Sequence, residues 1–281
     1  MKRVLITGAN SYLGDNTKRY LEEHGDYSVD VLDMLDSDWD KKDFSVYDVV
    51  FNVCAIVHQP RIKNGDLYYK VNRDLAFKIA EKAKKEGVKQ FIQTSTNGVF
   101  GVDVGTMMEK NGFKPRTFYE KSKYEADCML LNLRSKNFKV CILRPPLIYG
   151  SGCKGNFPKL EKFVLRVHFF PKITNRKDFI YIENICDFVR YCIDAEMDEI
   201  CYPRDILGIS ISEMALLIST CNSKKMHLLR ILNPFVRFAS LFMRSFKLVF
   251  GSNYCDEAIC SDNNWVPPYS TNEAIKKMYT K

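Results

Sequence analysis

The 281-residue sequence predicts an α/β protein, a doubly wound parallel sheet followed by a smaller C-terminal lobe. Short apolar runs alternate with amphipathic helical stretches over residues 1–150, which is the pattern of repeated βαβ units. The first run leads directly into a glycine-rich turn, and the alternation loosens after Gly150. We therefore expect a first domain at 1–150, to which a segment at about 176–200 returns, and a smaller lobe at 151–281.

The apolar runs have the length of buried parallel strands, and the stretches between them have one apolar face. Strands are expected at 4–6, 29–35, 49–53, 88–94, 138–143 and 179–182. Helices are expected at 12–23, 67–86, 118–134, 184–195 and 212–219. Only about a dozen residues separate the second strand from the third, too few for a full crossover helix and a further strand. We expect an abbreviated connection there.

Charge and cysteine patterns exclude several classes of protein. The sequence has 42 basic and 34 acidic residues and is 46% apolar, unlike a disordered, collagen-like or coiled-coil chain. Its ten cysteines include no C-x-x-C pair, so we expect neither a metal site nor a secreted disulfide framework. The apolar run before Thr7 is too short for a signal peptide, and no apolar stretch is long enough to span a bilayer. We expect a cytoplasmic protein without nucleic-acid partners.

The turn after the first strand has the features of an anion site. The segment T-G-A-N-S-Y-L-G at 7–14 joins a strand, a glycine turn and a helix start, where free amide groups face a pyrophosphate. Asp33 lies at the end of the second expected strand, where its carboxylate can accept hydrogen bonds from a ribose diol and repel a 2′-phosphate. No Arg or Lys lies between Asp26 and Trp39, so NAD is favoured over NADP. Alternatively, the glycines only shape a turn and Asp33 is a solvated strand end.

A second group of residues suits acid/base chemistry. Tyr119 and Lys123 are four residues apart on a predicted helix, so their side chains share a face. A neighbouring ammonium lowers the pKa of a tyrosine from its usual ~10, which suits proton transfer to and from a hydroxyl. Ser95 and Thr96 end a parallel strand, where ligands bind in open α/β sheets. Without the nucleotide site and the strand-end hydroxyl, a solvated helix face would be the preferred explanation of the Tyr/Lys pair.

Together, these segments resemble extended short-chain dehydrogenases/reductases of the NAD-dependent sugar epimerase/dehydratase family. Further matching segments occur in the order typical of that family. They are D-V-V-F-N-V-C-A at 48–55, V-N at 71–72, S-T-x-x-V-F-G at 95–101, R-P-P-L-I-Y-G at 144–150 and W-V-P-P-Y-S at 265–270. The resemblance covers nearly the whole chain and implies a Rossmann-type NAD-binding domain with a smaller substrate-binding lobe.

The resemblance also implies roles for single residues. Thr96 would bind a sugar oxygen, Tyr119 would be the acid/base, and Lys123 would be its pKa partner and a ligand of the nicotinamide ribose. The remaining NAD-binding positions would be Gly8, Ser11, Tyr12, Leu13, Gly14, Asp33, Ala55, Asn72 and Pro146. Ser11 stands where the family has its middle glycine; its side chain hinders close approach of phosphate, although its hydroxyl can donate to an anion. We expect a slightly displaced cofactor.

The segment after Thr96 bears on the reaction. Dehydratases of the family usually carry Asp-Glu there, whereas this chain has Asn97 and Gly98, which cannot do acid/base work. The preferred reaction is therefore epimerisation at C4 of an activated sugar with retained NAD, the sugar being a diphosphate-linked N-acetylhexosamine used for bacterial surface polysaccharide. A sugar-ketone reductase or dehydrogenase using free NAD(P)H, and a non-catalytic dinucleotide sensor, are the alternatives.

The C-terminal half carries candidate substrate contacts. Lys177 occupies the place where similar epimerases carry an arginine against the diphosphate, Arg176 is adjacent, and Asn156 is a candidate sugar or diphosphate contact. For each of them, surface charge or loop capping is the alternative. Helices at 67–86 and 118–134 are the segments through which a homodimer would form by resemblance.

Residues 228–251 form a basic segment rich in aromatic side chains. No acidic residue lies between Met214 and Cys255, and Arg230, Arg237 and Arg244 recur every seven residues. A helix of this kind is typical of membrane-surface binding, whereas core packing with arginines that are solvated or hold a pyrophosphate is the alternative. The segment also resembles bacterial epimerases of polyprenyl-diphosphate-linked N-acetylhexosamine. Peripheral membrane contact, and either a UDP or a polyprenyl carrier, therefore stay open.

Overall fold

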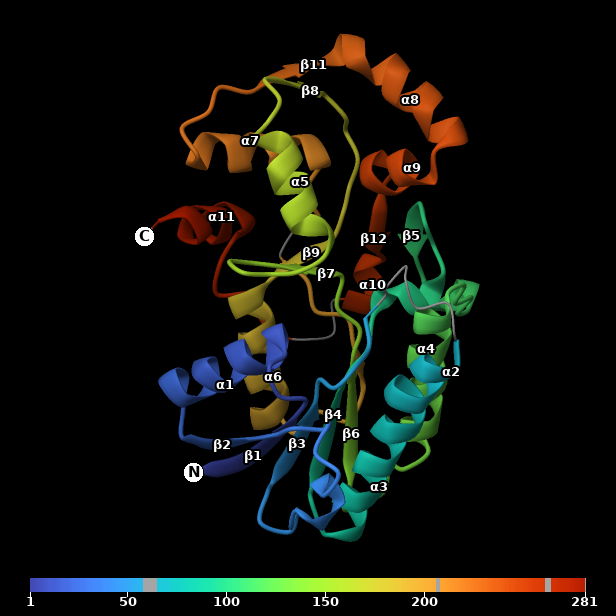
Figure 1. The fold of residues 1–281 in the computed structure, drawn as a ribbon, viewed down its shortest axis with the longest axis vertical. Coiled ribbons are helices and arrows are strands. Elements are labelled where there is room, and N and C mark those ends of the chain that lie inside the picture. The colour runs from blue at the N-terminus through green and yellow to red at the C-terminus, as the bar shows by residue number, and fades with distance from the viewer. Residues whose placement is uncertain (58–64, 206–207, 261–263, 281) are drawn as a thin grey trace. The chain divides into compact units, whose positions relative to one another are not determined.

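A computed structural model describes residues 1–57, 65–205, 208–260 and 264–280 (Figure 1). The chain divides into two compact units, each formed by segments that are distant in sequence. The first unit comprises Met1–Gly101, Phe113–Pro145 and Ile185–Pro203. The second unit comprises Val102–Gly112, Pro146–Asn184 and Arg204–Lys281.

The first unit contains a six-stranded parallel sheet, which confirms the expected α/β fold. Its strand order is β10-β6-β4-β3-β1-β2. The strands are β1 (Lys2–Thr7), β2 (Tyr27–Leu32), β3 (Val49–Asn52), β4 (Gln90–Thr94), β6 (Lys139–Leu143) and β10 (Ile200–Cys201). After β2 the chain crosses back to the other side of β1, so the winding direction reverses between β1 and β3. The carboxyl ends of these two strands therefore form the switch point at which open α/β sheets bind ligands.

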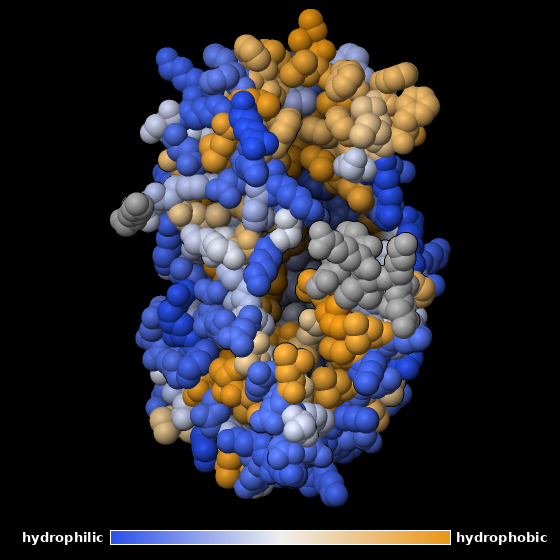
Figure 2. All heavy atoms as spheres, in the orientation of Figure 1, coloured by the Kyte–Doolittle hydropathy of each residue, from blue (hydrophilic) through white to orange (hydrophobic). Residues whose placement is uncertain are grey.

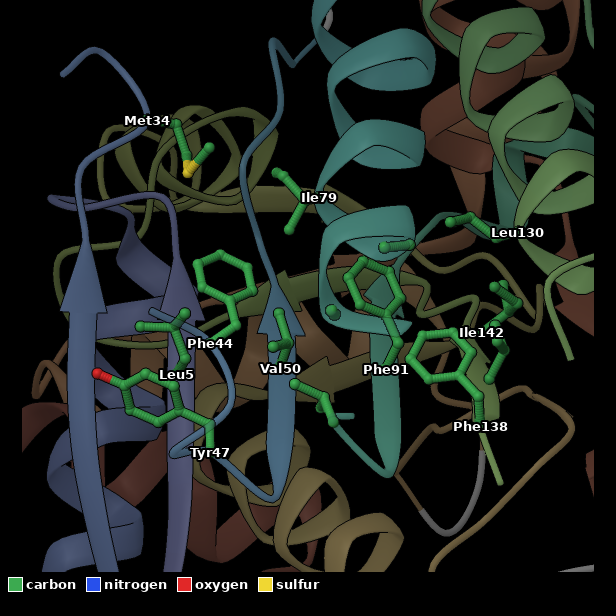
Figure 3. Packing of buried hydrophobic residues seen from close by; sticks show 14 residues of the cluster. Leu5, Met34, Phe44, Tyr47, Val50, Ile79, Phe91, Leu130, Phe138 and Ile142 are labelled. Carbon is green, nitrogen blue, oxygen red and sulfur yellow. The ribbon is translucent and has the colours of Figure 1, made fainter. Parts of the chain in front are cut away.

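The connection from β2 to β3 is abbreviated, as expected. A single 3₁₀ turn, η1 (Trp39–Lys41), stands in place of a crossover helix, and β3 pairs directly with β1. Met34, Phe44 and Tyr47 from this connection are buried together with Leu5 of β1 (Figure 3). These side chains cover the part of the sheet that a helix would otherwise shield from water.

Helices cover both faces of the sheet in the first unit. The core in Figure 3 joins Phe91 of β4 and Ile142 of β6 to Ile79 of α3 (Ala76–Lys85) and Leu130 of α4 (Phe118–Leu131). On the other face, α1 (Tyr12–His24) is tied to α6 (Ile182–Asp194) by a hydrogen bond from Tyr20 to Asp187.

The helix expected at 67–86 is continuous but irregular. It begins as α2 (Gly65–Tyr68), continues through a π-helical stretch, η2 (Tyr69–Leu75), and ends as α3. Such π-helical turns are rare in proteins, and those that occur often lie at functional sites. This one carries the fully buried Asn72.

The second unit consists of three parallel two-stranded pairs and several helices. The pairs are β5 (Gly105–Met107) with β12 (Asn253–Cys255), β7 (Leu147–Tyr149) with β9 (Phe179–Tyr181), and β8 (Phe169–Pro171) with β11 (His227–Leu229). The helices are α5 (Asn156–Val164), α7 (Ile211–Cys221), α8 (Asn233–Phe242), α9 (Arg244–Phe250), α10 (Glu257–Cys260) and α11 (Thr271–Tyr279). Serine–glutamate capping boxes start α7 and α11. In the described residues, no helix combines the length and apolar composition needed to cross a bilayer.

The basic aromatic segment at 228–251 is not one helix. The 3₁₀ turn η5 (Arg230–Leu232) precedes α8, and Met243 separates α8 from α9 because its backbone is extended, with φ −118° and ψ 105°. The arginine stripe expected on a single helix is therefore interrupted. Arg244, at the start of α9, forms an ion pair with Asp103 at 2.9 Å.

Candidate active site

The glycine turn after β1 lies against the loop that follows β3. Gly8 has φ +114°, and a Cβ atom there would lie 2.9 Å from both the Cα and N atoms of Cys54. Its amide N–H donates to the carbonyl of Leu32 at the end of β2. Glycine is therefore required at this position, because a side chain would collide with backbone that cannot move without disturbing the sheet.

Ser11 directly precedes α1 and is its N-cap residue. Its Oγ accepts a hydrogen bond from the amide of Gly14 at 3.1 Å, which satisfies one of the free donors of the first helical turn. That amide is consequently unavailable to an anion, although the Ser11 hydroxyl keeps its own hydrogen to donate. Gly14 is buried where a Cβ would come within 3.1 to 3.2 Å of Val53 and Ile6, so the helix packs closely on the sheet.

Asp33 lies directly after β2 and is exposed at the same end of the sheet as the glycine turn. Its Oδ1 accepts from the amide of Leu35 at 2.9 Å, and a carboxylate has further lone pairs for other donors. The tight approach at Gly8, the start of α1 and this carboxylate fit the pyrophosphate and one ribose of a dinucleotide.

Asn72 holds the loop after β3 in place. Its Oδ1 accepts from the amide of Ile56 at 2.8 Å, and its Nδ2 donates to the carbonyl of Ile56 at 3.0 Å and to Ser122 Oγ at 3.1 Å. Ala55 precedes Ile56 in this loop. Asn72 is a positioning residue here, since its side-chain amide is engaged by protein groups.

Thr96, Tyr119 and Lys123 come together in the first unit. Burial raises the pKa of Tyr119 to about 12, while interaction with the Thr96 side chain acts to lower it. Thr96 Oγ1 also accepts from the amide of Gly98 at 3.1 Å, which fixes the hydroxyl at the start of the 3₁₀ turn η3 (Asn97–Phe100). The expected hydroxyl–phenol arrangement is thus present.

The hydrogen bond of Lys123 goes to the backbone at the end of β4. Its Nζ donates to the carbonyl of Thr94 at 2.7 Å, and the groups that raise the pKa of Tyr119 most strongly after burial include Asp127 and Glu120. The i, i+4 spacing places both residues on one helix face, but the end of β4 offers the long lysine side chain an acceptor. Burial lowers the pKa of Lys123 to about 8, against the opposing effect of Asp127.

The structure also contains a buried ion pair, between Asp127 and Arg144, that the sequence analysis does not predict. Asp127 Oδ2 accepts from Arg144 Nε at 2.9 Å and from Ser95 Oγ at 2.8 Å. Arg144 also donates to the Tyr202 hydroxyl at 2.9 Å and lies over the ring of Phe113 at 4.4 Å. The sequence does contain a signal for Asp127, because this residue lies four positions after Lys123 and therefore shares the helix face of Tyr119 and Lys123.

The expected substrate contacts of the second unit engage protein groups. Lys177 Nζ donates to the carbonyls of Leu248 and Gly251 at 2.8 and 3.2 Å, at the carboxyl end of α9, and burial lowers its pKa to about 8. Arg176 pairs with Glu257 at 3.0 Å and lies over the ring of Tyr254. A lysine next to an arginine in sequence thus serves as a helix cap, which spacing alone does not reveal.

The other two expected positions lie near segment boundaries. Asn156 is exposed at the start of α5, and its Oδ1 accepts from Lys159 at 3.4 Å. Pro146 is the first residue of its segment of the second unit, directly after Pro145, whose carbonyl accepts from the amide of Asn97 at 3.1 Å.

Three cysteines also meet in the first unit. The sulfur atoms of Cys141, Cys192 and Cys201 lie within 4.8 Å of one another, and all three residues are buried. The absence of C-x-x-C spacing did not indicate this, because the residues come from β6, α6 and β10. Three thiols are one ligand short of the four that a structural zinc site takes, and buried thiols pack as small apolar groups.

Comparison with known families gives the site its context. The model of the NAD dependent epimerase/dehydratase family matches residues 4–200. The chain belongs to this family. Membership confirms the resemblance drawn from the sequence motifs, the expected class of enzyme and NAD as the cofactor.

Two curated relatives of this epimerase/dehydratase family member are 4-epimerases by name. The UDP-glucose 4-epimerase of Vibrio cholerae is 29% identical over 222 residues, which cover 69% of this chain and 67% of that protein. The N-acetyl-alpha-D-glucosaminyl-diphospho-ditrans,octacis-undecaprenol 4-epimerase of Escherichia coli O157:H7 is 28% identical over 208 residues, which cover 67% and 62%. The matched region thus spans about two thirds of these relatives or slightly less.

Among solved structures, the UDP-glucuronic acid 4-epimerase from Bacillus cereus in complex with NAD superimposes with a TM-score of 0.75. The superposition covers 99% of this chain and 97% of that one at 17% identity. This likeness confirms the Rossmann-type fold.

Proposed function

We propose that this protein is an NAD-dependent 4-epimerase of a diphosphate-linked N-acetylhexosamine for bacterial surface polysaccharide. The observation that carries the proposal is that the Thr96 hydroxyl, at the carboxyl edge of the sheet that carries the glycine turn, interacts with the Tyr119 phenol and acts to lower its pKa. A hydroxyl and a phenol held together there suit recognition of a sugar hydroxyl and removal of its proton. Bound NAD would supply the reversible acceptance of hydride from the sugar carbon.

Tyr119 carries the proton in this proposal. Because burial raises its pKa, the phenol is protonated at neutral pH in the absence of ligands. The phenol must lose this proton before the reaction starts. The phenolate then accepts the proton of the sugar hydroxyl in the oxidising half of the reaction and returns it to the sugar oxygen in the reducing half. Thr96 orients that oxygen, since its hydroxyl is fixed by the amide of Gly98.

Lys123 supplies the local positive charge. Asp127 opposes the effect of burial on the pKa of Lys123, and a pKa of about 8 leaves the ammonium mostly charged at pH 7. The ammonium is held at the carbonyl of Thr94, two residues before Thr96. A cation in this place favours the anionic forms of Tyr119 and of a ribose or sugar oxygen.

The residues after Thr96 favour epimerisation over dehydration. Asn97 and Gly98 have no titratable side chain, and η3 presents their backbone next to the Thr96 hydroxyl. Elimination of a sugar hydroxyl needs a second acid/base at these positions, which this chain does not place there. Both relatives named above are called 4-epimerases, which supports the same reaction.

The test is incubation of purified protein with UDP-N-acetylglucosamine, and in parallel with its polyprenyl-diphosphate counterpart, followed by sugar analysis. We expect interconversion of N-acetylglucosamine and N-acetylgalactosamine without stoichiometric nicotinamide. Consumption of one NADH per sugar would instead identify a sugar-ketone reductase. Binding of NAD without conversion of either sugar would favour a dinucleotide sensor.

A further inference from the structure

The outward face of α8 consists of large apolar side chains. This helix buries its smaller residues, Val236 and Ala239, against the rest of the second unit. The side chains that it exposes are 63 to 78% accessible and are Phe235, Phe238, Leu241 and Phe242. A surface helix normally turns its large apolar residues inward, so this arrangement is the reverse of the usual one.

The exposed apolar surface extends beyond α8. Ile231 precedes the helix with 82% of its surface accessible, and Met243, Leu248 and Val249 continue the surface into the next turns. We call these residues, with the four of α8, the apolar face; Figure 2 shows apolar residues gathered over α8 at the upper right. Contiguous exposed apolar patches of this kind mark interaction sites.

Ring contacts hold the apolar face in shape. The ring of Phe238 lies 5.1 Å from that of Phe242, and Phe235 lies 6.4 Å from Phe246 of α9. Phe250 in turn contacts the buried Phe170 of β8 at 5.9 Å. The face is therefore built on packed side chains of the second unit.

Positive charge surrounds the apolar face. Arg230, Arg237 and Lys247 are exposed, and Arg237 is four residues before Leu241, at the edge of the apolar arc of α8. No acidic residue occurs from Met214 to Cys255. Asp103 approaches from another segment and pairs with Arg244.

A basic depression lies on the other side of β11. It is lined by Arg166, His168, Lys225 and His227, next to Phe169, which pairs with His227 between β8 and β11. Since β11 leads directly into η5 and α8, the depression and the apolar face belong to one end of the second unit (Figure 1). The depression thus adds Arg166 and Lys225 to the positive charge at this end of the second unit.

We propose that this end of the second unit docks on an anionic lipid bilayer. Phe238, Leu241 and Phe242 enter the headgroup region, while Arg230 and Arg237 meet lipid phosphates. Charge decides the choice of occupant. A symmetric contact between two copies would bring the same positive groups face to face, whereas an anionic bilayer complements both the apolar and the basic parts.

This proposal is independent of the sugar chemistry, because vesicle binding is measured without substrate or NAD. The full chain is mixed with vesicles of phosphatidylcholine alone, or of phosphatidylcholine with phosphatidylglycerol, and floated on a density gradient at low and high salt. We expect flotation with the anionic vesicles, reduced by salt. Each removed positive charge should weaken binding about fivefold, since a basic residue near an anionic surface contributes ~1 kcal/mol.

Two variants separate the contributions. The triple variant Phe238→Ser, Leu241→Ser, Phe242→Ser should lose at least about tenfold in vesicle binding, because about 0.8 kcal/mol is gained per inserted methylene. The double variant Arg230→Gln, Arg237→Gln should lose about 25-fold at low salt. All five side chains are exposed, so folding should be unaffected.

Matched controls are Val266→Ser for the apolar variant and Lys110→Gln with Lys136→Gln for the charge variant. These residues are exposed on other segments, and we expect them to leave vesicle binding unchanged. Equal losses in control and test variants would overturn the proposal. A second outcome would also overturn it: wild-type protein that does not bind anionic vesicles and sediments as a dimer, together with a triple serine variant that sediments as a monomer. The apolar face would then join two copies of the chain.

Discussion

Asp127 and Arg144 form an ion pair at 2.9 Å, and neither side chain is more than 1% exposed. The pair connects α4 to the end of β6 and anchors Ser95, the residue before Thr96. A charge in such a place is tolerated only with its partner, because an unpaired ion in the protein interior has lost its hydration without compensation.

Asp127→Asn should therefore lower the free energy of unfolding by ~3 to 5 kcal/mol, because it leaves the Arg144 guanidinium uncompensated. Urea unfolding at neutral pH measures the change. Glu125, on the same helix as Asp127, forms a more accessible ion pair with Arg73. The matched variant Glu125→Gln breaks this pair and should lower the free energy of unfolding by at most ~1 kcal/mol. Similar losses in the two variants would contradict a special role for the buried pair.

Tyr119→Phe should reduce kcat for epimerisation by ~10² to 10⁴, with little change in KM, because it removes the proton carrier and keeps the ring. Circular dichroism should show the folded protein. Tyr124→Phe, on the same helix, is the control and should retain full activity. If Tyr119→Phe were as active as wild type, another group would have to transfer the proton.

Gly8→Ala should abolish NAD binding and lower stability. The new methyl group would lie 2.9 Å from the Cys54 backbone, in a conformation with φ +114°. Gly87→Ala is the control, because Gly87 also has positive φ, at +86°, but its Cβ would meet no atom within 4 Å. The control should lose only ~1 to 3 kcal/mol of stability through backbone strain and should bind NAD normally in calorimetric titration.

Ser11→Gly should bind NAD more tightly than wild type, because it removes the side chain next to the phosphate turn. The loss of the cap to the Gly14 amide should change stability by only a few tenths of a kcal/mol, whereas Ser11→Ala should lower it by ~1 kcal/mol. Titration with NAD and thermal unfolding measure the two effects. Weaker binding by Ser11→Gly would show that the serine hydroxyl itself contacts the cofactor.

Stability should rise with pH from about 8 toward 10. Burial lowers the pKa of Lys123 from 10.5 to about 8, so in this window the unfolded chain binds a proton that the folded protein has released. Since the unfolded state then binds more protons, increasing pH favours folding. The rise in the free energy of unfolding should be smaller in Lys123→Met and unchanged in the exposed Lys136→Met. An equal rise in all three proteins would exclude Lys123 as its source.

Several parts of the fold and site could be predicted from sequence because they depend on neighbouring residues. The parallel strands follow from short apolar runs, and the abbreviated connection between β2 and β3 follows from the number of residues available. The turn at Gly8 follows from local spacing, and the position of Ser95 and Thr96 follows from the rule that ligands bind at the carboxyl ends of strands. These features need little knowledge of distant contacts.

Other features appeared only in the tertiary structure. The sequence placed Lys123 beside Tyr119, but the carbonyl of Thr94 receives its ammonium. Lys177 donates to carbonyls at the end of α9, which the sequence does not reveal, and three cysteines without motif spacing meet between β6, β10 and α6.

Periodicity along the chain established which residues of this protein share a helix or strand face, and with it the α/β fold and the outline of a nucleotide site. Tertiary structure decided which faces are covered, which charges are paired and which acceptor each long side chain reaches. The aromatic face of α8 illustrates the difference. Its apolar stripe is visible in the sequence, but whether such a stripe is buried or exposed depends on the segments that pack against it.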